Sequence, residues 1–279
     1  MLAEKLKQLG MDACAVTDHG VLYGAIDFYN AMTDAGIKPI IGMEAYVCRD
    51  RLDKTASGRE NSHLILLCEN NRGYENLMYL SSEAFISGYY YKPRMDYDLI
   101  REHHEGLIAL SACLSGDLPK LLLGGQEESA RAYVREMQDI FGKENFYIEL
   151  MDHGLRDEKT VIPRLIALAR EMDVPLVATN DCHYLERKDA EAQEILMCIQ
   201  TGKTLEDEQR MRMETRQLYV KSEAEMRALF AAVPDAVDRT QEIADRCHVT
   251  FEFGVTRLPH YPVPDGETYL SMLTRLCRE

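Results

Sequence analysis

The chain has 279 residues, 46% of them apolar, so it is long enough to bury a core as one large α/β domain or two smaller ones. This composition excludes a disordered chain and a small disulfide scaffold. With 32 basic and 47 acidic residues, its formal net charge is −15. Such a charge repels polyphosphate backbones unless metal ions, a local basic patch or another domain intervenes.

Short apolar runs that alternate with helical patterns fill the first two thirds of the chain. An opening helix over residues 1–9 ends at Gly10. Strands are predicted at residues 13–17, 39–47, 63–68, 107–113, 146–150 and 175–179, with helices at 22–35, 73–87, 127–141 and 158–172. Residues 49–61 and the tyrosine-rich segment 89–94 are predicted loops. This alternation predicts βαβ units and a parallel sheet, either a barrel or an open doubly wound sheet.

Helices dominate after residue 183, at 188–200, 222–230 and 235–247, and Ser222 and Glu225 have the spacing of a capping box. A strand is predicted at 249–253, then an extended connector at 258–264. A last helix from about residue 269 reaches the final residue without a cap. We therefore expect the chain to stop inside a larger protein.

The eight cysteines form no C-x-x-C pair, and several lie in apolar runs as small buried side chains. This usage predicts a reducing, cytoplasmic location. No run approaches the roughly 18 apolar residues that a membrane span requires. The amphipathic opening helix does not have the pattern of a signal peptide. We expect a soluble protein that does not interact with a membrane.

Side chains that bind divalent metals occur at nearly every predicted strand. In parallel α/β folds the carboxyl ends of the strands meet at one edge, where active sites form. Imidazole, thiolate and carboxylate groups are ligands of first-row metals. The candidates are His19, Glu44, His63, Cys113, Glu149, His153, Asp181 and His183.

Each candidate also has an ordinary explanation. A histidine after a strand is often a turn or surface residue, Cys113 suits a buried small side chain, and Glu149 could pair with an arginine. Asp181 and His183 would share one face of an extended strand, yet Asp and His also cap turns. Repetition along successive strands favours the metal site.

Five motifs resemble the polymerase and histidinol phosphatase (PHP) family. They are Thr17-Asp18-His19-Gly20, Gly42-Met43-Glu44, His63-Leu64, Ser111-Ala112-Cys113-Leu114 and Asn180-Asp181-Cys182-His183-Tyr184. Residues 36–42 and 90–94, together with Leu258-Pro259, narrow the resemblance to the PHP domain at the amino terminus of bacterial DNA polymerase III alpha subunits. The resemblance covers essentially the whole chain. It implies a PHP domain over residues 1–250, truncated at its amino terminus, and a connector with the start of a polymerase palm region over 251–279.

The resemblance implies a distorted seven-stranded (βα) barrel with up to three zinc, manganese or iron ions. The ligands that it implies are His19, Glu44, His63, Cys113, Asp181 and His183. Asp18 would orient His19 or cap the turn beside it. Lys92 and Arg94 are candidates for a phosphate or DNA contact at the barrel mouth, with solvated loop charges as the alternative. Glu149 and His153 do not match ligand positions in this pattern, so a structural role is expected for them.

The chain departs from the family pattern at its start. That pattern opens with a His-x-His strand and a later aspartate, so three of the usual nine ligands and the first barrel strand are missing. We expect a late start codon, a fragment or a partial gene model, and an incomplete metal cluster. A naturally shorter protein would have to cover two exposed strand edges.

Metal-dependent phosphoester hydrolysis is the expected chemistry of a complete cluster. For the polymerase family the resemblance implies 3′ to 5′ exonuclease proofreading within a DNA-directed DNA polymerase. DNA and other replicase subunits would then be the partners of the full-length protein. The alternatives are a stand-alone PHP phosphatase that acts on a small phosphate ester and a non-catalytic scaffold that supports the polymerase.

Overall fold

The computed structural model describes residues 1–256 and 258–279 and has two compact units, Met1–Val249 and Thr250–Glu279. The strands are β1 (Ala13–His19), β2 (Lys38–Cys48), β3 (Ser62–Cys68), β4 (Arg94–Asp96), β5 (Leu107–Leu110), β6 (Phe146–Leu150) and β7 (Leu176–Ala178). The helices of the first unit are α1 (Leu2–Gln8), α2 (Ala25–Asp34), α3 (Asn71–Ile86), α4 (Tyr97–Glu102), α5 (Asp117–Leu123), α6 (Glu127–Phe141), α7 (Arg156–Met172), α8 (Ala190–Thr201), α9 (Glu223–Leu229) and α10 (Asp235–Arg246). The second unit contains α11 (Tyr269–Leu276).

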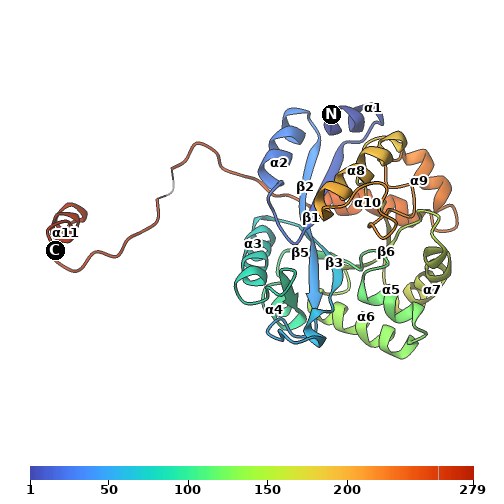
Figure 1. Ribbon diagram of the computed structural model, residues 1–279, viewed down its shortest axis with the longest axis horizontal. Helices are drawn as coiled ribbons and strands as arrows, with labels where there is room; N and C mark the ends of the chain where they lie inside the picture. The colour runs from blue at the N-terminus through green and yellow to red at the C-terminus, as the bar shows by residue number, and fades with distance from the viewer. Residues whose placement is uncertain (257) are drawn as a thin grey trace. The chain divides into compact units, whose positions relative to one another are not determined.

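All strands of the first unit belong to one curled sheet with helices packed around it (Figure 1). The order is β1-β2-β3-β5-β6-β7, and the short β4 pairs with β2. All six strands predicted within residues 13–179 are present, because each is a short apolar run; β2, β3, β5 and β6 are mostly buried, whereas β1 has no fully buried residue. The predicted α/β fold with a distorted barrel is confirmed.

The direction of β3 corrects the prediction of a wholly parallel sheet. β3 runs antiparallel to both β2 and β5, whereas β1–β2, β5–β6 and β6–β7 are parallel pairs. The link between β2 and β3 holds one short 3₁₀ turn, Ser57–Arg59, and no α-helix that would return the chain across the sheet. The amino end of β3 therefore lies at the same edge as the carboxyl ends of its neighbours.

Four smaller expectations differ from the structure. β4 begins at the last residue of the predicted loop 89–94, and the short helices α4 and α5, of 6 and 7 residues, were not predicted. Residues 249–253 form no strand, since only Val249 among them is buried. The last helix ends at Leu276 with Cys277 as its C-cap, before the final residue.

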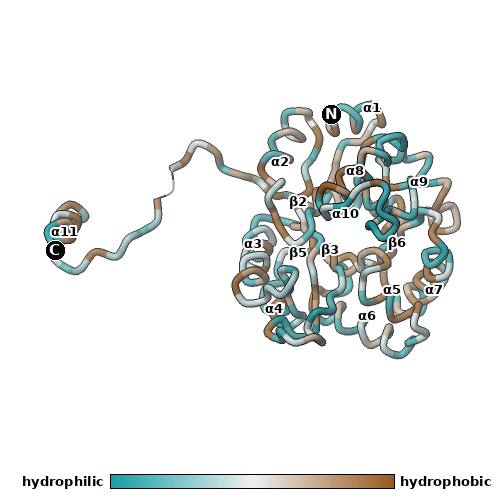
Figure 2. Tube along the Cα trace, viewed as in Figure 1, coloured by the Kyte–Doolittle hydropathy of each residue, from teal (hydrophilic) through white to brown (hydrophobic). Residues whose placement is uncertain are grey.

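Helix α10 packs against the inner face of the curled sheet. Its residues Ile243, Ala244 and Cys247 share one buried apolar cluster with residues of β2, β3, β5, β6 and β7. Apolar residues also follow the central strands in Figure 2, with polar residues on outer turns and loops. Arg246 of α10 donates to Glu69 and to the Tyr147 hydroxyl, near the amino end of β6. The helix therefore closes the edge that holds the amino ends of the parallel strands and leaves the opposite edge for side chains of the loops.

No helix among the described residues is both long enough and apolar enough to cross a membrane. The division between the two units falls after Val249, next to the predicted boundary at residue 250. The assignment of residues 251–279 to a polymerase region stays a prediction.

Candidate metal centre

Strand register brings three of the predicted ligands together. In the parallel pair β1–β2, His19 lies directly beside Glu44. In the antiparallel pair β2–β3, His63 lies opposite Tyr46, two residues beyond Glu44 on the same face of β2. His63 thus reaches the carboxyl edge from the amino end of its own strand. Its placement was predicted correctly, although the expected strand direction was wrong.

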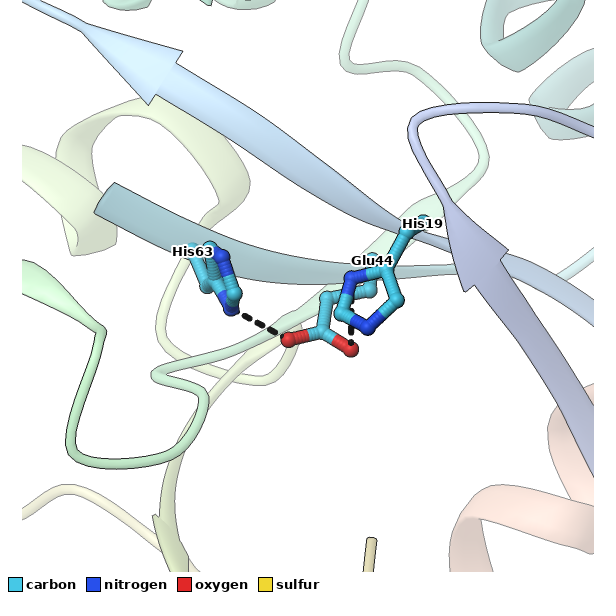
Figure 3. Close-up of side chains that lie close together, drawn as sticks. All are labelled: His19, Glu44 and His63. Carbon is cyan, nitrogen blue, oxygen red and sulfur yellow. Dashed lines mark ion pairs between the residues drawn. The ribbon is translucent and has the colours of Figure 1, made fainter. Parts of the chain in front are cut away.

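The carboxylate of Glu44 lies between the two imidazoles (Figure 3). Its Oε1 is 2.5 Å from His63 Nδ1, and its Oε2 is 3.4 Å from His19 Nδ1. One ligand atom from each of the three residues lies within 4.8 Å of the other two. Two imidazoles and one carboxylate at this separation are a donor set that fits a first-row divalent ion.

Tyr46 contributes an aromatic wall that the sequence analysis missed. Its ring stacks on His19 at 5.9 Å between centroids and meets His63 edge-on at 5.3 Å. The available signal was its position two residues after Glu44, which places both side chains on one face of β2. The ring limits the orientations that the two imidazoles can adopt.

Cys113 lies beside this cluster, with its Sγ 3.9 Å from His63 Nδ1. Burial raises the pKa of its thiol to about 12, and the negative charges of Glu44 and Asp181 act in the same direction, against hydrogen bonds at Ser115. The thiol is therefore protonated at neutral pH in the absence of a cation. A metal ion that binds Cys113 would have to displace this proton.

Asp181 and His183 come from the loop that follows β7. The strand ends at Ala178 and Asp181 has a φ of +42°, so the extended geometry expected for residues 181–183 is wrong. The two side chains still meet, with Asp181 Oδ1 3.6 Å from His183 Nδ1. Burial raises the pKa of Asp181, His183 opposes this shift, and Glu44 adds to it. Asp181 therefore shares its electrostatic environment with the His–Glu–His cluster.

A buried hydrogen-bond network holds the residue before Asp181. His153 Nδ1 is 2.6 Å from Glu158 Oε1, and its Nε2 donates to the Asn180 carbonyl at 3.0 Å. Lys221 Nζ donates to Asn180 Oδ1 at 2.7 Å. His153 thus has the structural role expected for it, with Glu158 as a partner that the sequence did not indicate.

Glu149 is buried behind the cluster, and its contacts bear on whether a cation fits. Its Oε1 accepts from the Thr179 hydroxyl at 2.6 Å, while its Oε2 has no hydrogen-bond partner in the described part of the chain. Burial raises the pKa of Glu149 to about 8, Thr179 opposes the shift, and Asp181 and Glu44 add to it. The arginine partner offered as its ordinary explanation is absent from the contacts of the described residues. Three interacting carboxylates with one orphaned buried oxygen fit a bound cation well.

The side chain of Asp18 contacts the backbone of the following turn and is not one of the clustered ligands. Its Oδ2 accepts a hydrogen bond from the backbone N–H of Gly24 at 3.1 Å, just before α2 begins. Asp18 was expected either to orient His19 or to cap the turn beside it, and this contact corresponds to the turn cap. Since a Cβ at Gly24 would lie 2.7 Å from that oxygen, the turn requires glycine.

The two predicted phosphate contacts have different outcomes. Lys92 is exposed, and its Nζ lies 3.4 Å from the Tyr46 hydroxyl, beside the cluster. Arg94 is fully buried, and its guanidinium donates to four backbone carbonyls, those of Gly88, Gly58, Arg51 and Asp53. No surface of Arg94 is available to DNA, so the predicted contact at Arg94 is wrong. A charged residue at the start of a three-residue strand gave no signal of burial.

The curled α/β sheet with a His–Glu–His cluster at one edge defines a barrel-like protein with a candidate divalent-metal centre. The sequence model of the PHP domain matches residues 1–153, and the chain belongs to the PHP family. That span contains His19, Glu44, His63 and Cys113, whereas Asp181 and His183 lie beyond it.

The chain is similar to three proteins named DNA polymerase III subunit alpha. It is 46% identical over 266 residues to the protein of Treponema pallidum, and the match covers 94% of this chain and 23% of the relative. For Helicobacter pylori strain J99 the identity is 44% over 257 residues, or 88% and 21% of the two proteins. For Thermus aquaticus it is 43% over 277 residues, or 95% and 23%. The chain thus spans 21 to 23% of the length of these relatives.

Proposed function

We propose that this chain is the PHP part of a bacterial replicative DNA polymerase, and that its metal centre hydrolyses phosphoester bonds at the 3′ end of DNA. The observation that carries the proposal is the cluster of His19, Glu44 and His63 at the carboxyl edge of the sheet. The names of the relatives support the polymerase, as does the share of this chain that each relative covers. DNA and other replicase subunits are the proposed partners, in a reducing cytoplasm.

The proposed ligand set extends beyond the three clustered residues. Cys113 is close enough to His63 to bind the same ion. Asp181 and His183 are proposed as further ligands, and they contact each other. Imidazole and thiolate donors favour zinc or iron, whereas the carboxylates also suit manganese. Glu149 adds a buried carboxylate behind these ligands.

A bound divalent ion would supply a Lewis acid and a water of lowered pKa for attack on phosphorus. The side chains of the protein contribute orientation and charge. Glu44 accepts contacts from both imidazoles and fixes how they face the substrate. Lys92 is the proposed contact for a phosphate oxygen, because its ammonium lies at the rim formed by Tyr46. In the overall reaction, water adds to phosphorus and the departing 3′ oxygen takes a proton.

A phosphoesterase assay tests this proposal. The purified chain is loaded with Mn²⁺ or Zn²⁺ and given a 5′-labelled single-stranded oligonucleotide, bis(p-nitrophenyl) phosphate, or histidinol phosphate. Because three ligands of the family pattern are missing, we expect only weak cleavage from the 3′ end, which is lost in Glu44→Gln and kept in Glu105→Gln, a matched change at an exposed glutamate. Hydrolysis of histidinol phosphate without DNA cleavage would favour the stand-alone phosphatase. Metal binding without hydrolysis of any substrate would refute catalysis and favour the scaffold.

A further inference from the structure

Two cation–aromatic pairs, joined by the chain at residues 91 and 92, extend from the candidate metal centre into the neighbouring loop. Tyr46 contacts both imidazoles, and Lys92 Nζ lies 5.0 Å from the centroid of the Tyr46 ring. Tyr91 is the neighbour of Lys92 in the chain, and the guanidinium of Arg59 lies 4.6 Å above the Tyr91 ring. We call Tyr46, Lys92, Tyr91 and Arg59 the cation–aromatic track.

The outer part of this track is open to solvent. Tyr91 is 61% exposed, and Arg59 and Lys92 are exposed as well. In the described part of the chain neither of these two cations forms an ion pair, although the chain carries a net charge of −15. The nearby carboxylate of Asp96 is already paired with Arg51. The track thus has free positive charge in an otherwise acidic protein.

Buried contacts hold the two loops of the track in place. The guanidinium of Arg94 donates to the carbonyls of Gly58 and Gly88, which precede Arg59 and Tyr91 in their loops. A Cβ at Gly88 would lie 1.8 Å from the Arg94 carbonyl oxygen, so the backbones are in close contact. The backbone N–H of Tyr90 donates to the Lys92 carbonyl at 3.0 Å, and Tyr91 sits at the apex with a φ of +62°. A surface that is fixed before binding loses less entropy when a ligand arrives.

We propose that the cation–aromatic track binds unpaired single-stranded DNA and leads its end toward the metal centre. A base would stack on the exposed Tyr91 ring, while Arg59 and Lys92 would contact the flanking phosphates. Alternating aromatic and cationic groups are the features with which proteins hold single strands without regard to sequence. Paired bases in a duplex do not expose their faces to such a ring. This inference rests on the proposed function, because DNA is the substrate proposed there.

Fluorescence anisotropy with a labelled oligothymidylate tests the track on the full 279-residue chain. The titration contains EDTA, so that the metal centre does not contribute. The variant is Tyr91→Gly, since glycine adopts a φ of +62° without strain and the fold is kept. Tyr269→Ala is the control, because Tyr269 is 60% exposed but lies in the carboxyl-terminal unit. Tyr91→Trp keeps a ring at the same position.

We expect Tyr91→Gly to weaken binding about tenfold, the scale of one base–aromatic stack, while Tyr91→Trp and Tyr269→Ala bind like the original chain. Arg59→Ala should weaken binding and reduce the slope of log affinity against log salt by about 0.7, as expected for one lost phosphate contact. Equal affinities of Tyr91→Gly and Tyr269→Ala would overturn the proposal. So would equal binding of a blunt duplex, or equal competition by an acidic peptide.

The outcome separates this proposal from the proposed function. If single-stranded DNA does not bind in EDTA but the metal-loaded chain hydrolyses bis(p-nitrophenyl) phosphate, the track is refuted and the phosphoesterase stands. If DNA binds through Tyr91 but the chain takes up no metal, the track stands and the phosphoesterase is refuted.

Discussion

Replacement of Glu149 by glutamine should stabilise the metal-free protein at high pH. Glutamine keeps the shape of the side chain and an oxygen that can accept the Thr179 hydroxyl, but it removes a buried titratable group. The pKa of Glu149 is about 8 in the folded protein, against an ordinary value of 4.5. The folded state therefore holds a proton that the unfolded state has lost at any pH between these two values.

The sign and size of the effect follow from this difference. Because the folded state binds more protons, the free energy of unfolding falls as pH rises from about 4.5 to 8, by at most about 1.4 kcal/mol per pH unit. The full shift corresponds to an upper limit of about 5 kcal/mol, and we expect about 2 to 3 kcal/mol after relaxation of the buried site. The stabilisation by the protonated carboxyl is complete below pH 4.5 and lost near pH 8.

Urea unfolding in EDTA at pH 5, 6, 7 and 8 measures this dependence. The difference between Glu149→Gln and the original chain should be near zero at pH 5 and grow steadily in favour of the variant toward pH 8. Glu105→Gln, at an exposed position, controls for the loss of one negative charge. Parallel curves for Glu149→Gln and the original chain would refute the assignment of a buried, protonated carboxyl at this position.

Three further substitutions test the supporting structure. Asp181→Asn should reduce bound metal, measured by mass spectrometry of the metal content, and an unchanged content would remove Asp181 from the site. Arg94→Met should lower the free energy of unfolding by about 3 kcal/mol, because four backbone carbonyls lose their donor, and a loss below about 1 kcal/mol would contradict this role. His153→Ala should cost about 2 kcal/mol, since Glu158 Oε1 loses its imidazole partner while Oε2 keeps its two backbone donors, and it should also weaken metal binding through Asn180; normal metal affinity would contradict the coupling.

The strands and most helices were predictable from the sequence because each depends on local pattern. The continuous apolar runs of β2 and β3 identify strands that are buried on both faces, and the capping box at Ser222 and Glu225 marks the start of α9. The direction of β3 was not predictable in this way. It depends on whether residues 49–61 stay at one edge of the sheet or return the chain to the opposite edge. The apolar pattern of a strand does not encode its orientation.

In the candidate site, too, the features set by local sequence were predictable and those set by distant contacts were not. His19 ends β1, His63 lies at the start of β3, and Glu44 lies within β2 beside His19, so position along the strands sets position in space and the structure brings the three together. The burial of Arg94 and the Thr179 partner of Glu149 were not predicted, because both depend on contacts between residues far apart in sequence, such as the carbonyl of Gly58 with Arg94 or the hydroxyl of Thr179 with Glu149. Such contacts leave no periodic signal.

Calorimetric titration with Mn²⁺ or Zn²⁺ tests the central claim most directly, by comparison of the original chain with Glu44→Gln. The carboxylate of Glu44 touches both imidazoles, so its loss should remove the shared site and leave the fold intact. We predict stoichiometric binding of at least one ion per original chain and a loss of that binding in the variant. Equal stoichiometry and affinity in the two proteins would contradict a metal centre built on His19, Glu44 and His63.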